Sequence, residues 1–402
     1  MKSDSKPPDS FTRSALSLLS LLQSMNIQLY AFDKIFKWAH ECATEYKHDF
    51  STKPTSRKQF LRSLSQSSGI HHLRPLTSRI QLPHTKTYTN LTTVSIRECI
   101  YTLLTDTQLM KDENLLFNGP SPLSPPNPLE DDAIPPEHLF DDINSGTCYF
   151  QAWKKHCTPG SNDVLLPLIF FIDKTFIDRK GKLNSEPVTF TLGIFKRSVR
   201  NNNPEAWRSI GLIPDSFQAG YHQSKNKAMD YHHILSLIFG ELKKCQKSAG
   251  IAWKLNYNGT KHSVTFIPVI HLIVTDTKAA DDLCGKNQFR GTSLDNMPTR
   301  LCRFCDVSGE DVDNPDFKYT LTKSADIEAL YELKQEQLLT RISYRPIRNA
   351  FWDLILSDEY GINGCTPPDT LHLILKGVHL YLRECFFDLL RPDPKERTSS
   401  KR

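Results

Sequence analysis

The stretch that decides the fold is Val164–Ile172, VLLPLIFFI, which is almost entirely apolar and is followed directly by Asp173. A second run, Val264–Val274 (VTFIPVIHLIV), leads through Thr275 into Asp276. Near-continuous apolar runs of this length are typical of strands that are covered on both faces. We therefore expect two buried strands, each ending at an aspartate, in one α/β core.

Further elements fill the interval between these two runs. Val188–Phe195 and Ser209–Ile213 are short and rich in β-forming residues, and Met229–Ser248 has the apolar spacing of a long helix. The pair Asn258-Gly259 predicts a tight hairpin turn just before the second apolar run. The predicted order is a buried strand, two strands, a long helix and another buried strand.

The rest of the chain predicts a modular arrangement. Residues 1–118 are expected to form a helical N-terminal region, which includes a helix over Ser95–Leu109. Residues 119–145 are rich in proline and are expected to form a linker or an exposed loop. The core is expected over residues 146–390, and residues 391–402 form a polar tail.

One basic segment of the N-terminal region has two interpretations. Its cations either lie on a solvated helix face or contact a DNA backbone; they are Lys53, Arg57, Lys58 and Arg62.

Composition describes an ordinary soluble protein. Hydrophobic residues make up 39% and charged residues 24%, and the net charge of +5 permits nucleic acid as a partner without requiring it. The ten cysteines form no disulfide framework, which favours a reducing compartment. Because no segment approaches the roughly 18 apolar residues of a membrane span, we expect no membrane partner.

The two strand-end aspartates predict a site for a divalent cation. If the two strands lie side by side, Asp173 and Asp276 reach the same edge of the sheet, where hard carboxylate oxygens suit Mg²⁺ or Mn²⁺. Two such ions would clamp the attacking and leaving oxygens of a phosphodiester. The alternative is that each aspartate simply caps the turn or helix that follows its strand.

A cysteine pair predicts a second, structural metal. Cys302-Arg-Phe-Cys305 has the spacing at which two thiolates reach one zinc ion. His372, in the segment Pro-Pro-Asp-Thr-Leu-His, is a candidate third ligand, with Cys365 or His379 as the fourth. His379 is a poor fourth ligand, because it lies two helical turns beyond His372. The alternatives are that the cysteine spacing is incidental and that His372 is a half-buried helix residue.

Taken together, these segments resemble the Plavaka-type transposases of the CACTA-like superfamily of cut-and-paste DNA transposons. The similar segments follow one order along the chain: residues 26–43 (NIQLYAFDKIFKWAHECA), Leu165–Pro214 with Asp173-Lys174-Thr175 and WRSIGLIP, the strand that ends at Asp276, the Cys302/Cys305 pair, and Pro367–Gly377.

The resemblance implies an RNase H-like fold that carries out phosphodiester hydrolysis and strand transfer. It implies that Asp173 and Asp276 hold the catalytic Mg²⁺ or Mn²⁺. It also implies that Cys302, Cys305 and His372 bind structural Zn²⁺ within an insertion from about residue 284 to 365. The implied partners are transposon-end and target DNA, in a homo-oligomer located in the nucleus.

Two departures from the family pattern qualify these expectations. A third acid, usually Glu, is expected beyond the Lys-Gly segment, and Glu384 and Asp388 come too early for it, so the core is expected to be truncated. The stretch after the second strand lacks a proline-bearing motif, so Asp281 or Asp282 competes with Asp276 for its role. The rival interpretations are an inactive or domesticated DNA-binding remnant, and an unrelated nuclease or zinc-stabilised interaction protein.

Overall fold

The computed structural model separates the chain into two compact units, residues 1–73 and 74–402. The residues that the structure describes are 73–126, 142–176, 184–214, 225–248, 250–287, 302–308 and 316–368, with single residues at 311, 314, 379, 382, 383, 385 and 386. Every element below belongs to the second unit.

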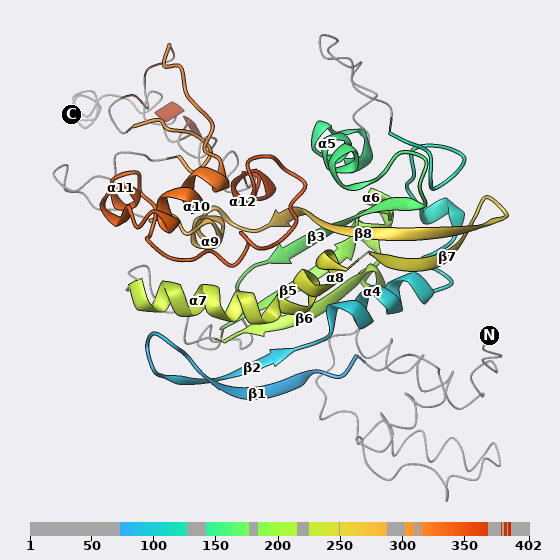
Figure 1. Ribbon diagram of the computed structural model, residues 1–402, viewed down its shortest axis with the longest axis horizontal. Helices are drawn as coiled ribbons and strands as arrows, with labels where there is room; N and C mark the ends of the chain where they lie inside the picture. The colour runs from blue at the N-terminus through green and yellow to red at the C-terminus, as the bar shows by residue number, and fades with distance from the viewer. Residues whose placement is uncertain are drawn as a thin grey trace, which may run out of the picture. The chain divides into compact units, whose positions relative to one another are not determined.

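The described strands form one mixed sheet of eight strands, in the order β1-β2-β6-β5-β3-β8-β7 with β4 beside β5 (Figure 1). Their bounds are β1 Leu76–Gln81, β2 Tyr88–Thr93, β3 Asp163–Ile172, β4 Thr175–Phe176, β5 Asn184–Leu192, β6 Trp207–Ile213, β7 Ile251–Tyr257 and β8 Thr260–Val274. β3 lies at the centre, antiparallel to β5 and parallel to β8.

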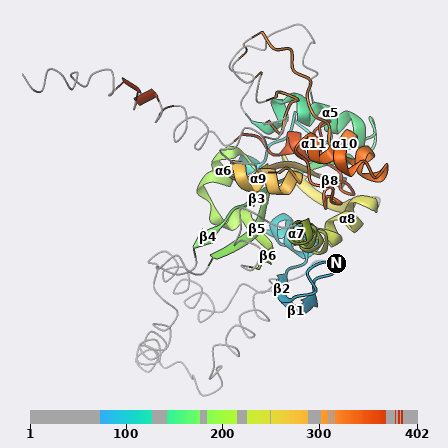
Figure 2. The same cartoon turned by 90° about the vertical axis from the view of Figure 1, so that its left-hand side faces the viewer.

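Helices cover both faces of this sheet. Their bounds are α4 Ile96–Thr105, α5 Thr147–His156, α6 Arg197–Asn202, α7 Lys225–Ile238, α8 Gly240–Lys247, α9 Thr277–Cys284, α10 Ser324–Glu332, α11 Glu336–Arg341 and α12 Ile362–Cys365. Short 3-10 turns occur at Asp112–Asn114, Ile143–Ser145 and Pro204–Ala206. Figure 2 shows α7 nearly end-on beside β5 and β6, and α7 contacts β6.

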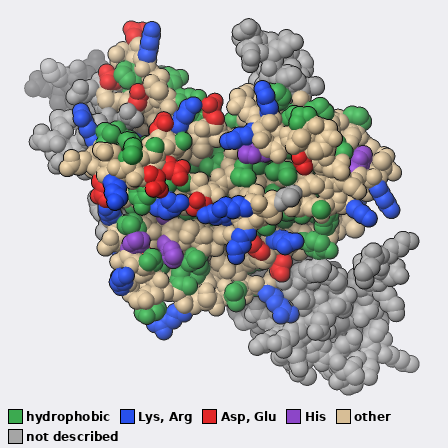
Figure 3. Space-filling view, viewed as in Figure 1, with side chains coloured by type: hydrophobic (Ala, Val, Ile, Leu, Met, Phe, Trp, Pro, Cys, Tyr) green, Lys and Arg blue, Asp and Glu red, His purple; other side chains and the backbone are tan. Residues whose placement is uncertain are grey.

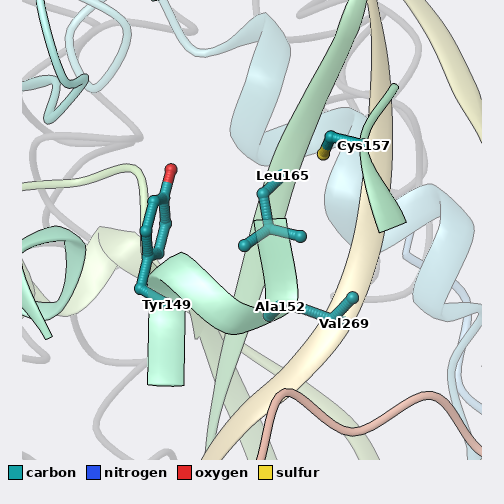
Figure 4. Close-up of a cluster of buried hydrophobic side chains, with 5 residues drawn as sticks. All are labelled: Tyr149, Ala152, Cys157, Leu165 and Val269. Carbon is teal, nitrogen blue, oxygen red and sulfur yellow. The ribbon is translucent and has the colours of Figure 1, made fainter. Parts of the chain in front are cut away.

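Alternate residues of β3 pack into two layers, because successive side chains of a strand point to opposite faces. On one face, the Phe170 ring lies 5.1 Å from the Phe239 ring at the junction of α7 and α8. On the other face, Leu165 packs with Tyr149 and Ala152 of α5 and with Val269 of β8 (Figure 4). This double coverage explains why the deciding run is apolar at nearly every position.

Several sequence predictions are confirmed. The run Val164–Ile172 forms β3 and is buried except at Phe171, and Val264–Val274 forms most of β8. α4 begins within the predicted helix, where the Ser95 side chain accepts a hydrogen bond from the Glu98 N–H. The predicted turn joins β7 to β8, with Asn258 at φ 49° and Gly259 at φ 70°, the left-handed region that such turns require.

The predicted long helix over Met229–Ser248 is divided. α7 ends at Ile238 and α8 begins at Gly240. Phe239 lies between them, with its ring 5.1 Å from Phe170 and 5.2 Å from Phe351. Burial of this ring in the core accompanies the change in chain direction.

The structure also differs from the expected helical N-terminal region. Residues 76–93 form the β1–β2 hairpin, which adds to the sheet through β6. The exposed side chains of this hairpin give a sequence pattern with little apolar content, so periodicity did not reveal it. In the expected proline-rich linker, residues 127–141 lie outside the described part of the chain.

Within the expected insertion, the structure shows α10 and α11, which the sequence did not predict. Among the described residues, no helix combines the length and apolar character needed to cross a membrane. The basic segment around Lys53–Arg62 falls outside the described residues.

Candidate active site

The two predicted aspartates follow neighbouring strands at the same edge of the sheet. β3 and β8 are paired in parallel, and their last paired residues are Phe171 and Val274. Asp173 and Asp276 each come two residues later, so continuation of the register makes them equivalent positions. In open α/β sheets, ligands bind outside the carboxyl ends of the strands. Both side chains are half-buried there.

Local backbone contacts orient both carboxylates. Asp276 is the N-cap of α9, and its Oδ1 accepts a 2.6 Å hydrogen bond from the Ala279 N–H. Asp173 Oδ1 accepts a 2.8 Å hydrogen bond from the Lys174 N–H. The capping role considered for the strand-end aspartates is thus present at Asp276. A carboxylate has a second oxygen, so a cap does not exclude metal binding.

A third carboxyl group, Glu186, enters this edge from β5. The register of β3 with β5 pairs Ile172 with Val188, which places Glu186 opposite Lys174 when it is continued by two residues. Glu186 is only 3% exposed, and its Oε1 accepts a 2.8 Å hydrogen bond from the Tyr231 hydroxyl. Burial raises the pKa of Glu186 to about 7, against the opposing effects of this hydrogen bond and of Lys174.

Electrostatics link these acids into one neighbourhood. The negative charges of Asp282 and Asp173 also raise the pKa of Glu186. Burial, followed by the charges of Glu186, Asp282 and Asp276, raises the pKa of the buried Tyr231 hydroxyl. The carboxyl end of the central strands is therefore an acidic edge, at which a bound cation would relieve mutual repulsion.

Asp281 and Asp282, the alternatives to Asp276, are engaged by arginines. Arg303 Nη1 lies 3.3 Å from Asp281 Oδ1, and Arg345 Nη1 lies 3.2 Å from Asp282 Oδ1. Burial raises the pKa of both carboxyls, and the arginine partner in each case lowers it. These contacts indicate that Asp281 and Asp282 stabilise α9 against the insertion, which favours Asp276 as the edge ligand.

Three consecutive residues of α7 form hydrogen bonds to the segments that surround this edge. Asp230 accepts hydrogen bonds from the backbone of the β1–β2 turn, and Tyr231 donates to Glu186. His232 Nδ1 accepts from the Ala350 N–H, and its Nε2 lies 3.1 Å from the Asp282 carbonyl oxygen. Burial lowers the pKa of His232 to about 4, so the ring is neutral near pH 7 and donates through Nε2.

The donor set at this edge fits a hard divalent cation in part. Asp173 and Asp276 supply oxygen ligands of the type that Mg²⁺ and Mn²⁺ prefer, from adjacent positions. Among the described residues, no group of three or more His, Cys, Asp or Glu side chains is arranged to hold a metal ion. The two aspartates would therefore supply only some of the ligands that such a cation needs.

The cysteine pair forms a compact loop. The Phe304 N–H donates to Cys302 Sγ over 3.3 Å, and both cysteine side chains are half-buried. Burial is the main cause that raises the pKa of the Cys305 thiol. Two thiols at C-x-x-C spacing, with a backbone N–H directed at one sulfur, have the donor types that suit Zn²⁺.

Arg303, within the same loop, links it to the segment that precedes His372. Its Nη2 donates to the Thr366 carbonyl over 3.0 Å. His372 itself lies outside the described residues. Cys365, one candidate fourth ligand, is fully buried and its thiol donates to the Ile270 carbonyl over 3.6 Å. That contact directs Cys365 toward β8.

Sequence reasoning missed Glu186 and the Asp230-Tyr231-His232 run. A local signal for each exists, because Glu186 stands at the entry to an apolar strand and the run places three polar residues together in a helix. Neither signal shows that the residues are buried or that Tyr231 contacts Glu186, since the contact joins positions 45 residues apart.

Comparison with known proteins identifies a family for most of the second unit. A search of curated proteins found no match. A family model described as Plavaka transposase matches residues 81–383, a range that contains both aspartates, Glu186 and the cysteine pair. Because this match covers well over half of the 402 residues, the chain belongs to the Plavaka transposase family.

Proposed function

We propose that this chain carries an RNase H-like core that cleaves and joins DNA strands, within the general function of DNA transposition that its family indicates. The sheet supports this proposal. β3, β5 and β6 form an antiparallel meander, α7 and α8 follow, and β8 then pairs in parallel with β3. The Ile270 N–H also donates to the Ile355 carbonyl, and Leu356 forms a parallel bridge with Ile270, so β8 has a further parallel neighbour.

The observation that carries the proposal is the equivalent placement of Asp173 and Asp276 after adjacent parallel strands. These two carboxylates would hold Mg²⁺ or Mn²⁺, which, when bound, neutralises charge on the phosphate and polarises the attacking oxygen. The Ala279 N–H fixes one oxygen of Asp276. The Tyr231–Glu186 contact supports the strand next to Asp173 from within the core.

We also propose that Cys302 and Cys305, with His372, bind a structural Zn²⁺. The C-x-x-C spacing of the two cysteines and the Phe304 N–H that donates to Cys302 support this assignment. Arg303 joins the loop to Thr366 and Asp281, so zinc there would stabilise the packing of the insertion against α9. This role is structural and separate from the cleavage site.

The test is metal-dependent nicking of supercoiled plasmid DNA by the full chain with Mg²⁺ or Mn²⁺. Asp173→Asn and Asp276→Asn are each expected to reduce nicking by about 10²–10³-fold, the cost of losing one preorganised charge-stabilising group. The matched control is Asp163→Asn, because Asp163 is the first residue of β3, at the opposite end from Asp173. Equal nicking by the Asp173→Asn variant and the wild type would disprove the proposal.

A second candidate function is a DNA-binding protein that keeps the transposase fold without cleavage. It is favoured by one observation, that no third acidic ligand joins Asp173 and Asp276 among the described residues. Binding of the plasmid without nicking, in either metal, would support this alternative.

Location and assembly follow from the proposed chemistry. We propose that the chain acts in the nucleus, where its DNA substrate lies, and that it works as a homo-oligomer, because two transposon ends must be cleaved and joined together. Sedimentation of the full chain with end-bearing DNA would report the oligomer, and a monomeric complex would argue against it.

A further inference from the structure

The β1–β2 hairpin extends past the acidic edge of the sheet. β2 pairs with β6 only at Thr92 and Thr93, and Thr92 lies opposite Leu212. Leu212 pairs with Pro187 of β5, and continuation of the β3–β5 register by one residue places Pro187 opposite Asp173. Thr92 is therefore level with Asp173 along the strand direction. Tyr88 is four residues further along, or about 13 Å at the rise of a strand. In Figure 1 the hairpin turn accordingly lies beyond the arrowheads of β3 and β8.

One face of this hairpin is polar and open. The register of β1 with β2 places six side chains on that face: Thr77, Arg79, Gln81, Tyr88, Asn90 and Thr92. The first five are exposed and the sixth is half-buried. The other face points to α7, because Thr93 pairs with Gly211, and a Cβ on Gly211 would meet Ile238. Leu91 is buried on that inner face.

The charge of the hairpin is of one sign. Residues 73–95 contain Arg74, Arg79 and Lys86 and no acidic residue. Within the described part of the chain, none of these three cations forms an ion pair with a carboxylate. In Figure 3, the lower left part of the surface, where the hairpin runs, carries Lys, Arg and His side chains and no acidic ones.

The hairpin is also preorganised. The Arg79 guanidinium lies 4.7 Å from the centre of the Tyr88 ring, a stacking arrangement that holds its planar set of donors in place. At the turn, Asp230 Oδ1 accepts from the His84 N–H at 2.9 Å and Oδ2 accepts from the Thr85 N–H at 2.7 Å. Asp230 is fully buried, so the turn is fixed to α7 beside Tyr231.

We propose that the outward face of this hairpin binds the backbone of duplex DNA and directs it to the acidic edge. This inference rests on the proposed function, since it takes DNA as the substrate. Arg79 and Lys86 would contact phosphates, while Gln81 and Asn90 would donate amide hydrogen bonds to backbone oxygens. A two-stranded ribbon with basic and amide side chains and no acids complements a uniformly negative backbone.

The test measures binding of the full chain to a labelled 30-base-pair duplex, with chelator present so that no cleavage occurs. For the wild type, the logarithm of the association constant falls with the logarithm of salt concentration by about 0.9 per phosphate contact. The Arg79→Gln/Lys86→Gln variant is expected to bind less tightly and to lose about 1.8 from that slope. Arg79→Lys keeps the charge, so its slope is expected to match the wild type.

The matched control is Lys254→Gln/Lys261→Gln. These two exposed lysines lie on the β7–β8 hairpin, at the opposite edge of the same sheet. The control is expected to keep the wild-type slope. An equal loss of slope in both double variants, or a wild-type slope in Arg79→Gln/Lys86→Gln, would overturn the proposal.

A second experiment identifies what occupies the face. Replacement of Tyr88 by the photoreactive residue p-benzoylphenylalanine is expected to crosslink the full chain to the DNA. Crosslinking to residues 1–73 in the presence of DNA would overturn the proposal, because that segment would then cover the face. If the wild type nicks DNA while the hairpin variant binds normally, only this inference fails. Absence of any DNA binding by the wild type removes the proposed function as well.

Discussion

Asp276 is level with Asp173 because β8 contains one more residue than β3 between their shared pairs. The pairing runs from Asp163 opposite Thr265 to Phe171 opposite Val274, with a bulge after Leu168. The extra residue is His271, whose neighbour Ile270 donates to the Ile355 carbonyl and accepts from the Ser357 N–H. If the register were continuous, with His271 opposite Ile169, Thr275 would stand level with Asp173. A bulge changes the direction in which the following side chains point, and bulges are common next to functional sites.

Asp276 has two roles that variants can separate: it caps the N-terminus of α9, and it is a proposed metal ligand. Asp276→Ala removes the acceptor for the Ala279 N–H, so we expect a loss of about 1 kcal/mol in the free energy of unfolding. Asp276→Asn keeps an acceptor of similar capping strength, so its stability should stay near that of the wild type. Both variants are expected to lose nicking. Urea unfolding checks the first property, and equal stability of the two variants would contradict it.

The raised pKa of Glu186 predicts that the free energy of unfolding falls as pH rises. The pKa of its carboxyl is about 7 in the folded protein, against an ordinary value of 4.5. Between these values the folded state holds a proton that the unfolded state has released, so the free energy of unfolding declines across this window. The raised pKa corresponds to roughly 3 kcal/mol, fully present below pH 4.5 and lost above pH 7.

The Glu186→Gln variant isolates this effect. The glutamine amide oxygen can still accept from the Tyr231 hydroxyl, while the ionisation is removed. Urea unfolding at pH 5, 6, 7 and 8 should therefore show a smaller decline with pH in the variant than in the wild type. Identical pH dependence in the two proteins would assign the decline to other groups.

Removal of the Asp230 carboxylate is expected to loosen the β1–β2 turn, which this side chain holds through two hydrogen bonds. Asp230→Ala leaves two backbone N–H groups without their charged acceptor, and we expect about 3 kcal/mol of destabilisation. Hydrogen exchange at His84 and Thr85 should become faster. Asp230→Asn provides the control, because it keeps one oxygen acceptor and should show a smaller effect on both measurements. Unchanged exchange in Asp230→Ala would show that the turn is held by other contacts.

The cysteine pair predicts a measurable metal content. We expect one zinc per purified chain, lost in Cys302→Ser together with a lower midpoint of thermal unfolding. Cys284→Ser is the matched control. The Cys284 thiol is buried and lies 3.5 Å from the hydroxyl of Thr366, the residue whose carbonyl accepts from Arg303 of the cysteine loop. Zinc content that is equal in all three proteins would exclude Cys302 as a ligand.

Much of the central fold follows from local sequence. The run Val164–Ile172 predicted a strand covered on both faces, because its apolar side chains leave no polar face for solvent. The Asn258-Gly259 turn is equally local, since it depends on backbone conformations that these two residues adopt easily. The β1–β2 hairpin escaped prediction because its outward side chains are polar, and only pairing with β6 reveals it as part of the sheet.

By itself, the sequence determined that two buried strands are each followed by an aspartate and that two cysteines have the C-x-x-C spacing. Both are properties of short segments, in which spacing along the chain fixes spacing in space. Only the tertiary structure decided that β3 and β8 are neighbours with Asp173 and Asp276 at one level. It also decided that Glu186 meets Tyr231 and that Asp230 holds the hairpin turn. These contacts join residues 45 to 146 positions apart, and strand order and helix packing, which depend on the whole chain, bring them together.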